Sequence, residues 1–358
     1  MVDSGRLAAV GAACERRLSI GKLPVNLLER VVSRYRGRIR SEVVLHPAVG
    51  EDSCAVDPSD MLVVMSTDPI TGADEGIGRL SVHISCNDVA ANGAEPLGVL
   101  VTMLFPPGSS EGELERVMGG IESAAREVGI EILGGHTEVT EAVTQVLLST
   151  TAIGLAPRDR LVTKSGASAG DVLVMTKAAG LEATAILATD FEDVLVPEIG
   201  AVVVDRAKSF TDEISVVREG LIAAANGATA MHDATEGGIL GAVYEMAEAA
   251  GKCGGQPLGF ALEMESVPVR PETASICRLA GVDPLRVVSS GSMLISCRPV
   301  AASGIVEALR LASIEARIIG EFTRDARVLV AGDVTTAVEP PGPDHLWAAR
   351  RNLRSRRG

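Results

Sequence analysis

Two hydrophobic periods follow one another along the chain, which predicts mixed helices and strands. The segment 23–35 has a helical period, with these apolar residues on one side and charges opposite: Leu27, Leu28, Val31 and Val32. From about residue 42 the pattern is typical of strands and turns. The apolar run 61–67 has the length of a buried strand, and it is expected to stop at Asp68-Pro69.

Two helices are predicted in the first half of the chain from their apolar period and from the residues that begin and end them. Residues 78–93 read as an apolar helix that ends at Gly93, with Pro96 beyond it. A second helix is predicted to follow Ser110, which forms a capping box with Glu113, and to close at Gly129. A strand then leads to a Gly134-Gly135 turn, and 143–155 reads as a long strand.

The second half repeats this mixture after a polar stretch of small residues at 156–170. We predict strands at 171–177, 291–297 and 316–322, helices up to about 225, at 239–251 and at 303–313, and a turn at 232–238. The expected fold class is α+β in two domains. The predicted division is an N-terminal helical extension (1–40), an N-terminal domain (41–157), a larger C-terminal domain (158–338) and a basic, flexible tail (339–358).

Composition and charge narrow the function classes. The chain has 358 residues and a formal net charge of −14, which argues against non-specific nucleic-acid binding because that needs a basic surface. The basic block is the tail, which is expected to be solvated rather than to contact nucleic acid or membrane: Arg350, Arg351, Arg354, Arg356 and Arg357. The six cysteines form no C-x-x-C pair, so a zinc site is not expected and a cytoplasmic address is preferred.

The helix 78–93 carries a carboxylate that needs an explanation. At 100° per residue, Ser81, Ser85, Asp88 and Asn92 share one narrow polar stripe, while Asn87 lies at another edge. An Asp inside an apolar helix loses hydration unless something pairs with it. Asp88 is therefore a candidate functional residue.

Other acidic residues stand at predicted element ends or turns: Asp52, Asp68, Glu138 and Asp233. Each has a structural alternative, as a turn former, a strand cap or a loop charge. If they converge, mutual repulsion is about 4 kcal/mol per close pair at an effective dielectric near 20. Hard oxygen donors without a His or Cys group select Mg²⁺, which commonly bridges to phosphates. A Mg²⁺–nucleotide site is therefore consistent with the acidic composition.

Glycine pairs supply a second candidate feature. Gly134-Gly135 and Gly237-Gly238 can bring backbone N–H groups close to an anion, and the second pair opens a predicted helix. No G-x-x-x-x-G-K-[ST] motif and no G-x-G-x-x-G motif after a strand is present, so P-loop and Rossmann sites lack support.

Seven motifs, taken in order, resemble one ATP-dependent superfamily: GKLP, GEDSCAV, STDP, CNDVAANGAEPLG, GGHTE, GDVLVMTKAAG and HDATEGG. This PurM-like superfamily contains aminoimidazole ribonucleotide (AIR) synthetase, selenophosphate synthetase, thiamine-monophosphate kinase and the hydrogenase-maturation protein HypE. The resemblance covers about residues 20–335, and GKLP followed by LLER looks most like the HypE group. It implies an N-terminal α+β domain whose sheet pairs with that of a second subunit, a larger C-terminal α+β domain, and ATP in the cleft between them.

The resemblance also implies roles for particular residues. Asp52, Asp68 and Asp88 would hold Mg²⁺ against the ATP phosphates, supported by Asn87 and Glu138. The remaining implied contacts to phosphates, cleft or substrate are Gly50, Gly134, Gly135, Thr137, Lys164, Asp233, Thr235, Gly237 and Gly238. Lys177 is an alternative to Lys164, and either lysine is equally well explained as a surface residue.

One departure from the HypE pattern concerns cysteine. Members of that group end in a cysteine whose sulfur carries the carboxamide to be dehydrated, whereas the last cysteine here is Cys297. The resemblance thus predicts a cytoplasmic, homodimeric Mg²⁺- and ATP-dependent enzyme without that terminal cysteine. It would activate an amide, carboxylate or phosphate acceptor, carried by a small molecule or a protein. The alternatives are a thiamine-monophosphate-type kinase, or a non-catalytic paralogue that binds nucleotide and a maturation partner protein.

Overall fold

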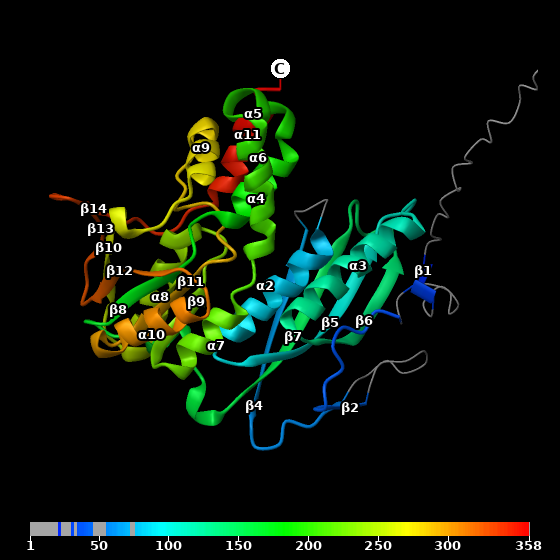
Figure 1. The fold of residues 1–358 in the computed structure, drawn as a ribbon, viewed down its shortest axis with the longest axis horizontal. Helices are drawn as coiled ribbons and strands as arrows, with labels where there is room; N and C mark the ends of the chain where they lie inside the picture. The colour runs from blue at the N-terminus through cyan, green and yellow to red at the C-terminus, as the bar shows by residue number, and fades with distance from the viewer. Residues whose placement is uncertain (1–20, 23–29, 32–33, 46–54, 72–75, 358) are drawn as a thin grey trace, which may run out of the picture.

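Two sheets with their covering helices form two α+β domains, as Figure 1 shows. The computed structural model describes residues 21–22, 30–31, 34–45, 55–71 and 76–357. The expectations for 1–20, for most of 23–35 and for Gly50 and Asp52 lie outside these residues. The two-domain α+β fold class is confirmed.

The N-terminal domain is built on a five-stranded sheet of order β1-β6-β5-β7-β4. Its strands are β1 (Gly21–Lys22), β4 (Leu62–Ile70), β5 (Glu95–Phe105), β6 (Glu131–Val139) and β7 (Leu147–Ala156). Only β5 and β6 run parallel within this sheet; its other neighbours are antiparallel. The helices α2 (Ile77–Ala91) and α3 (Glu111–Val128) cover one face. The hairpin β2 (Val43–Leu45) and β3 (Ala55–Val56) packs over Leu97, Leu133 and Ile153.

The two N-terminal helices begin and end as their sequences predict. Ser110 caps α3 by accepting a hydrogen bond from the Glu113 N–H at 3.2 Å, and Gly129 closes that helix in the left-handed conformation. After α2, Gly93 adopts a positive φ of 73°. Because α2 lies between its own sheet and the second domain, it is buried on almost every side.

Strand β4 differs from its prediction. It runs through Asp68 and Pro69 to Ile70, so Asp68 is inside the strand and does not cap its end. Proline is tolerated there because β4 is an edge strand of the sheet. The strand is also only half-buried, with Met65 64% exposed on the face away from α2.

The predicted Gly134-Gly135 turn is wrong. Both glycines lie within β6, where the pairing with β5 shifts register between Val99 and Leu100. A Cβ on Gly135 would lie 1.9 Å from the Val101 carbonyl oxygen, so only glycine allows the two strands to approach this closely.

The C-terminal domain has a seven-stranded sheet of order β14-β13-β10-β12-β8-β11-β9. The strands are β8 (Val172–Thr176), β9 (Ala228–Asp233), β10 (Gly259–Glu263), β11 (Met293–Cys297), β12 (Ala316–Thr323), β13 (Arg327–Ala331) and β14 (Val334–Ala337). Helix α8 (Gly238–Gly254) packs on one face, and α7 (Val217–Ala225) and α10 (Pro299–Leu311) pack on the other. A further helical cluster contains α4 (Leu181–Asp190), α5 (Glu192–Ile199), α6 (Ala201–Lys208), α9 (Pro271–Ala280) and α11 (His345–Arg354).

The prediction of a flexible tail from residue 339 is wrong. Asp344 caps α11, and Leu346, Ala349 and Leu353 of this helix are buried in the helical cluster. Arg357 pairs with Asp193 at 2.6 Å, so part of the basic block is engaged inside the chain. An amphipathic period of this kind brings the C-terminal segment back onto the domain.

The two domains meet along α2 and α7. Gly220 of α7 lies so close to α2 that an added Cβ would stand 2.3 Å from the Ala90 carbonyl oxygen. This contact places one side of α2 against the second domain, while Ser85 and Asp88 of the polar stripe bond to Thr150 and Ser66 of the N-terminal sheet. Among the described residues, no helix combines the length and the apolar character that crossing a bilayer requires.

Candidate active-site cavity between the domains

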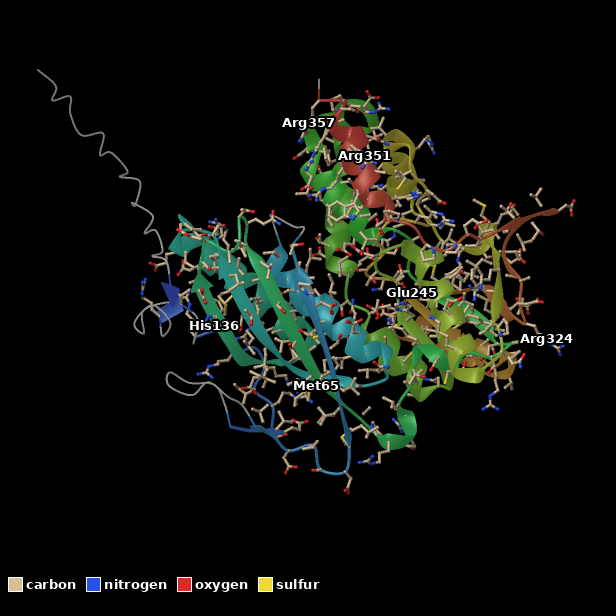
Figure 2. All side chains as sticks on the ribbon, turned by 180° about the vertical axis from the view of Figure 1, so that it is seen from behind. Met65, His136, Glu245, Arg324, Arg351 and Arg357 are labelled. Atoms are coloured by element: carbon tan, nitrogen blue, oxygen red, sulfur yellow. The ribbon has the colours of Figure 1, made fainter. Side chains whose placement is uncertain are left out.

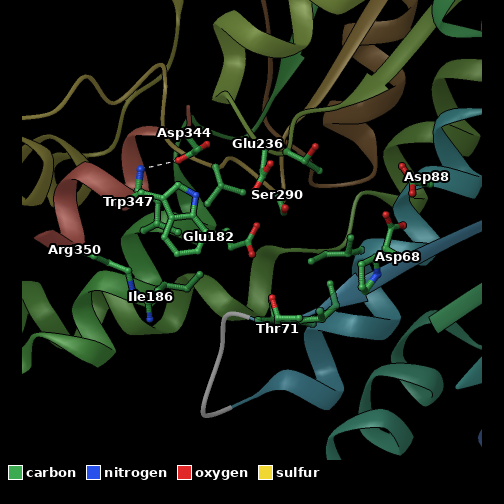
Figure 3. A pocket seen from close by; sticks show the side chains of 17 residues that line it. Asp68, Thr71, Asp88, Glu182, Ile186, Glu236, Ser290, Asp344, Trp347 and Arg350 are labelled. Carbon is green, nitrogen blue, oxygen red and sulfur yellow. Dashed lines mark hydrogen bonds between the residues drawn. The ribbon is translucent and has the colours of Figure 1, made fainter. Parts of the chain in front are cut away.

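A cavity of about 350 Å³ lies where the end of β4, helix α2 and the C-terminal domain meet. This volume is in the range of small-ligand sites. Figure 3 shows carboxylates from both domains around it, with Asp68 and Asp88 at one side and Glu182 and Trp347 at the other. Its polar and charged lining residues include Asp68, Thr71, Asp88, Glu182, Thr235, Glu236, Ser290, Asp344 and Arg350.

Asp88 is the carboxylate that the helical pattern singled out, and the structure points it into this cavity. Its Oδ2 accepts a hydrogen bond from the Ser66 hydroxyl at 2.8 Å. Burial raises the pKa of Asp88 to about 8, and the nearby charges of Asp233 and Asp68 act in the same direction. In the cation-free protein this carboxyl is therefore largely protonated near neutral pH.

Asp68 reaches the same place from β4. Its neighbour across the sheet is Thr150 of β7, and the side chain faces α2. The buried Oδ2 has no hydrogen-bond partner among the described residues. A buried oxygen left unpaired costs about 1–3 kcal/mol, more when charged, which is the cost expected at a site built for a ligand.

Asp233 approaches from the second domain, at the end of β9, and is almost fully buried. Burial opposes its ionisation, but the adjacent His232 and the charge of Lys164 outweigh it and hold the pKa of Asp233 below its usual value. Neither carboxylate oxygen has a hydrogen-bond partner among the described residues, since His232 Nδ1 is 3.6 Å from Oδ1.

His232 connects this cluster to α8. Its Nε2 lies 2.9 Å from Glu245 Oε2. Burial of the ring opposes protonation, yet Asp233 and Glu245 together raise the pKa of His232 above its ordinary value. Lys164, in the short 3₁₀ turn Lys164–Gly166, is close enough to act electrostatically on all three side chains.

Mg²⁺ fits the donor chemistry at this point. Asp68, Asp88 and Asp233 offer hard oxygens, several of them unpaired, on three different elements. Among the described residues no group of three or more His, Cys, Asp or Glu side chains forms a closed metal cage. Mg²⁺ does not need one, because it keeps several waters and is usually held by one or two carboxylates and phosphate oxygens. Asp52, the third expected ligand, is outside the described residues.

Asn87 does not face the cavity. Its amide nitrogen donates to the Ile214 carbonyl at 2.9 Å, and its oxygen accepts from the Val216 N–H at 2.8 Å. The side chain is fully buried and joins α2 to the segment before α7. This geometry gives Asn87 a role in domain packing, so we do not retain it among the proposed catalytic residues.

The β6 candidates are not brought to the cavity within one chain. Gly134, Gly135, Thr137 and Glu138 lie on β6, three strands from β4 in the sheet order, or about 14 Å at the usual strand spacing. Glu138 pairs with His136 at 3.0 Å. Figure 2 shows His136 on the five-stranded sheet, well apart from Glu245 of the second domain.

The glycines of the second pair do open a helix, as expected, and both have positive φ. The anion at this helix start is part of the chain itself, because the Gly237 N–H donates to Asp344 Oδ2 at 2.7 Å. Gly238 is required sterically, since its Cβ would stand 2.6 Å from the Leu285 and Val287 oxygens. Thr235, at the preceding turn, lines the cavity as predicted.

Lys177 is fully engaged elsewhere. Its ammonium group pairs with Glu219 at 2.8 Å and donates to the Glu213 and Ser215 carbonyls. Of the two lysine alternatives, only Lys164 remains a candidate for phosphate.

Several cavity residues were not anticipated. Glu182 interrupts the apolar run of α4, a signal of the same kind as Asp88. Trp347 and Asp344 belong to the segment that the sequence predicts to be a flexible tail. The spacing of Leu346, Ala349 and Leu353 after an Asp cap would have predicted this helix.

Two α+β domains that enclose a carboxylate-lined cavity define a protein of the two-domain, PurM-like class. Family models agree: residues 50–156 match the AIR synthase related protein, N-terminal domain, and residues 168–332 match the AIR synthase related protein, C-terminal domain. The chain belongs to the AIR synthase related protein family.

Within this family the chain is similar to HypE proteins. Carbamoyl dehydratase HypE of Cupriavidus necator is 30% identical over 291 residues, which is 78% of this chain and 79% of that protein. The Rhizobium leguminosarum HypE is 28% identical over 343 residues, covering 89% and 91%. The crystal structure of E. coli HypE superposes with a TM-score of 0.73 at 24% identity, covering 90% of this chain and 97% of that one.

Proposed function

We propose that this protein is a Mg²⁺- and ATP-dependent enzyme of the HypE type. It binds ATP in the cavity between its domains and activates an oxygen of an amide, carboxylate or phosphate acceptor by phosphoryl transfer. The observation that carries the proposal is the convergence of the partly buried Asp68 and Asp88 with the buried Asp233, with unpaired oxygens on Asp68 and Asp233. Such a cluster is strained in isolation and is relieved by a divalent cation.

The similar proteins support the nucleotide. Relatives carry the name carbamoyl dehydratase HypE, and a HypE structure in complex with ATP superposes with a TM-score of 0.68 at 20% identity. In this chain Asp68 and Asp88 would hold Mg²⁺, and Lys164 would face phosphate charge next to Asp233. When bound, the cation supplies charge neutralisation at the phosphates, and the protein contributes mainly positioning.

Partner proteins are the second part of the proposal. A HypE–HypF complex is among the similar structures, with a TM-score of 0.66 at 21% identity. This similarity supports a maturation partner protein, and we propose in addition a cytoplasmic location and a homodimer. The homodimer would form through the outer face of the five-stranded sheet, where Val63 and Met65 are 40% and 64% exposed.

Titration calorimetry with the non-hydrolysable analogue AMPPNP and Mg²⁺ tests the proposal. We expect binding that disappears without Mg²⁺ and weakens at least tenfold in Asp68→Asn. Absence of Mg²⁺-dependent binding to the wild-type chain would refute it. An ADP-release assay with thiamine monophosphate distinguishes the kinase alternative, whose solved examples share the fold at 17–18% identity.

A further inference from the structure

The cavity continues beyond the aspartates into a chamber between α4 and α11, on the Glu182 and Trp347 side of Figure 3. We call it the α4–α11 chamber and define it by these residues: Glu182, Ile186, Val288, Ser290, Leu346 and Trp347. Its walls are largely apolar, and the Trp347 ring is half-exposed. A chamber with apolar walls and a few polar groups has the usual character of a site for an organic ligand.

Two polar side chains in this chamber are buried, and each has an atom without a hydrogen-bond partner among the described residues. Glu182 is 8% exposed and Ser290 is 1% exposed. Neither Glu182 Oε2 nor Ser290 Oγ has a hydrogen-bond partner among the described residues. Buried carboxylates normally have a partner, so both atoms are placed to meet a ligand.

Two neighbouring segments place acidic groups near Glu182. Asp344 faces it from the start of α11 and Glu236 from the turn before α8. Arg350 of α11 also lines the cavity; its Nη2 pairs with Asp190 of α4, whose charge offsets that of the guanidinium, and its Nε has no hydrogen-bond partner among the described residues. The chamber is therefore acidic, and it disfavours an acceptor that carries negative charge.

We propose that the α4–α11 chamber holds the acceptor and that Glu182 is the catalytic base that takes a proton from an uncharged N–H or O–H group. The inference rests on the proposed function and narrows it to neutral acceptors. The acceptor oxygen forms a bond to the γ-phosphorus of ATP, and the bond from that phosphorus to ADP breaks, leaving its electron pair on ADP. The acceptor's N–H or O–H proton passes to Glu182 Oε2, while Ser290 Oγ is available as a further hydrogen-bond partner.

The electrostatic setting of Glu182 suits a base. Burial raises the pKa of Glu182 to about 7; the side chain and backbone of Ser290 oppose this rise, and the charges of Asp344 and Glu236 add to it. A base is most effective when its pKa lies near the working pH.

Water, the simplest O–H acceptor, allows a test with the full-length chain. We expect slow Mg²⁺-dependent ATP hydrolysis to rise with pH through about 7. Glu182→Gln should lower this rate at least 100-fold and abolish the rise, while Mg²⁺–AMPPNP affinity stays within threefold. Glu182→Asp keeps a carboxylate and should retain the pH dependence at a reduced rate. Glu236→Gln removes an equal charge from the same cavity and should keep the rise, with its midpoint moved to lower pH because the charge of Glu236 raises the pKa of Glu182.

A matched pair of probes tests the acceptor class. N-acetylglycinamide is neutral and N-acetylglycine is its anionic counterpart. We expect the amide to stimulate ADP release more than the acid, and the difference to vanish in Glu182→Gln. The inference would be overturned if folded Glu182→Gln kept the wild-type rate and pH profile. It would also be overturned if neither probe affected ADP release, or if both probes stimulated it equally. Loss of Mg²⁺–AMPPNP binding by the wild-type chain would instead count against the proposed function.

Discussion

Replacing Asp88 with asparagine should stabilise the metal-free protein and at the same time remove Mg²⁺-dependent nucleotide binding. The reason is that burial, together with the nearby Asp233 and Asp68, raises the pKa of Asp88 to about 8 in the folded chain, against an ordinary value of 3.8. Between these two values the folded state binds more protons than the unfolded state. Stability contributed by this group is therefore lost as pH rises through that window.

The size of the effect follows from the shift. About 1.4 kcal/mol per pKa unit over roughly four units sets a ceiling of about 5–6 kcal/mol at pH 8 and above. Because Asp68 and Asp233 readjust, we expect about half, or ~2–3 kcal/mol. An unfolding entropy of roughly 2.1 cal/mol/K per residue over 358 residues converts this to a rise in Tm of about 3–4 °C. At pH 5.5 less than half of the rise should remain.

Differential scanning calorimetry from pH 5.5 to 8.5, with EDTA, measures this directly. Asp333→Asn, at an exposed position in the turn between β13 and β14, is the matched control and should leave Tm unchanged. With Mg²⁺ and AMPPNP at about 1,000 times Kd the order should reverse, because the ligand then stabilises the wild type by about 4.1 kcal/mol, more than the variant gains from the substitution. The reasoning would be refuted if Asp88→Asn had a lower Tm than the wild type at pH 8 in EDTA. It would also be refuted if Mg²⁺–AMPPNP raised the Tm of the variant as much as that of the wild type.

Three further outcomes are expected. Asn87→Ala leaves two buried backbone groups without partners, so urea titration should show a free energy of unfolding lower by about 2–4 kcal/mol, with Mg²⁺–AMPPNP affinity within threefold of the wild type. A loss of affinity without a loss of stability would instead place Asn87 in the nucleotide site. Leu353→Ala should cost about 2–5 kcal/mol by the same method, whereas a mobile tail would give no change. Met65→Glu should dissociate the proposed homodimer in sedimentation experiments, whereas the control Asp159→Lys, on an exposed turn, should not. An unchanged sedimentation coefficient for Met65→Glu would place the interface elsewhere.

Local signals in the sequence predicted the helices well because each signal lies within the helix or directly beside it. The caps of α3, the glycine stop of α2 and the period of α8 need no information about distant residues. The errors occurred where a residue has two local meanings. Pro69 normally ends a strand but is tolerated at an edge, and Gly134-Gly135 is read as a turn or as a bulge depending on the partner strand.

The sequence could not predict which site residues come together, because this depends on how the two domains pack. The position of Asp88 on an apolar helix predicted that something must meet it, but not that Asp233, 145 residues further on, raises its pKa. That encounter is set by α2 fitting against α7, where Gly220 removes the side chain that would hold the helices apart. The same packing separates Asn87 from Asp88, since adjacent positions on a helix point about 100° apart. One turns to the cavity and the other to the Ile214 and Val216 backbone.

Glu182 and Asp88 have a common feature, and the difference in their surroundings explains why the cavity has two parts. Each is a carboxylate on a helix whose neighbours are apolar, and burial raises the pKa of each, to about 7 and about 8. Asp88 has other carboxylates beside it, a combination that a cation relieves. Glu182 lies among apolar residues, near the unpaired hydroxyl of Ser290 and the charges of Asp344 and Glu236, a combination that a neutral proton donor relieves. The cavity thus separates the place where charge is neutralised from the place where a proton is removed, as phosphoryl transfer to an uncharged acceptor requires.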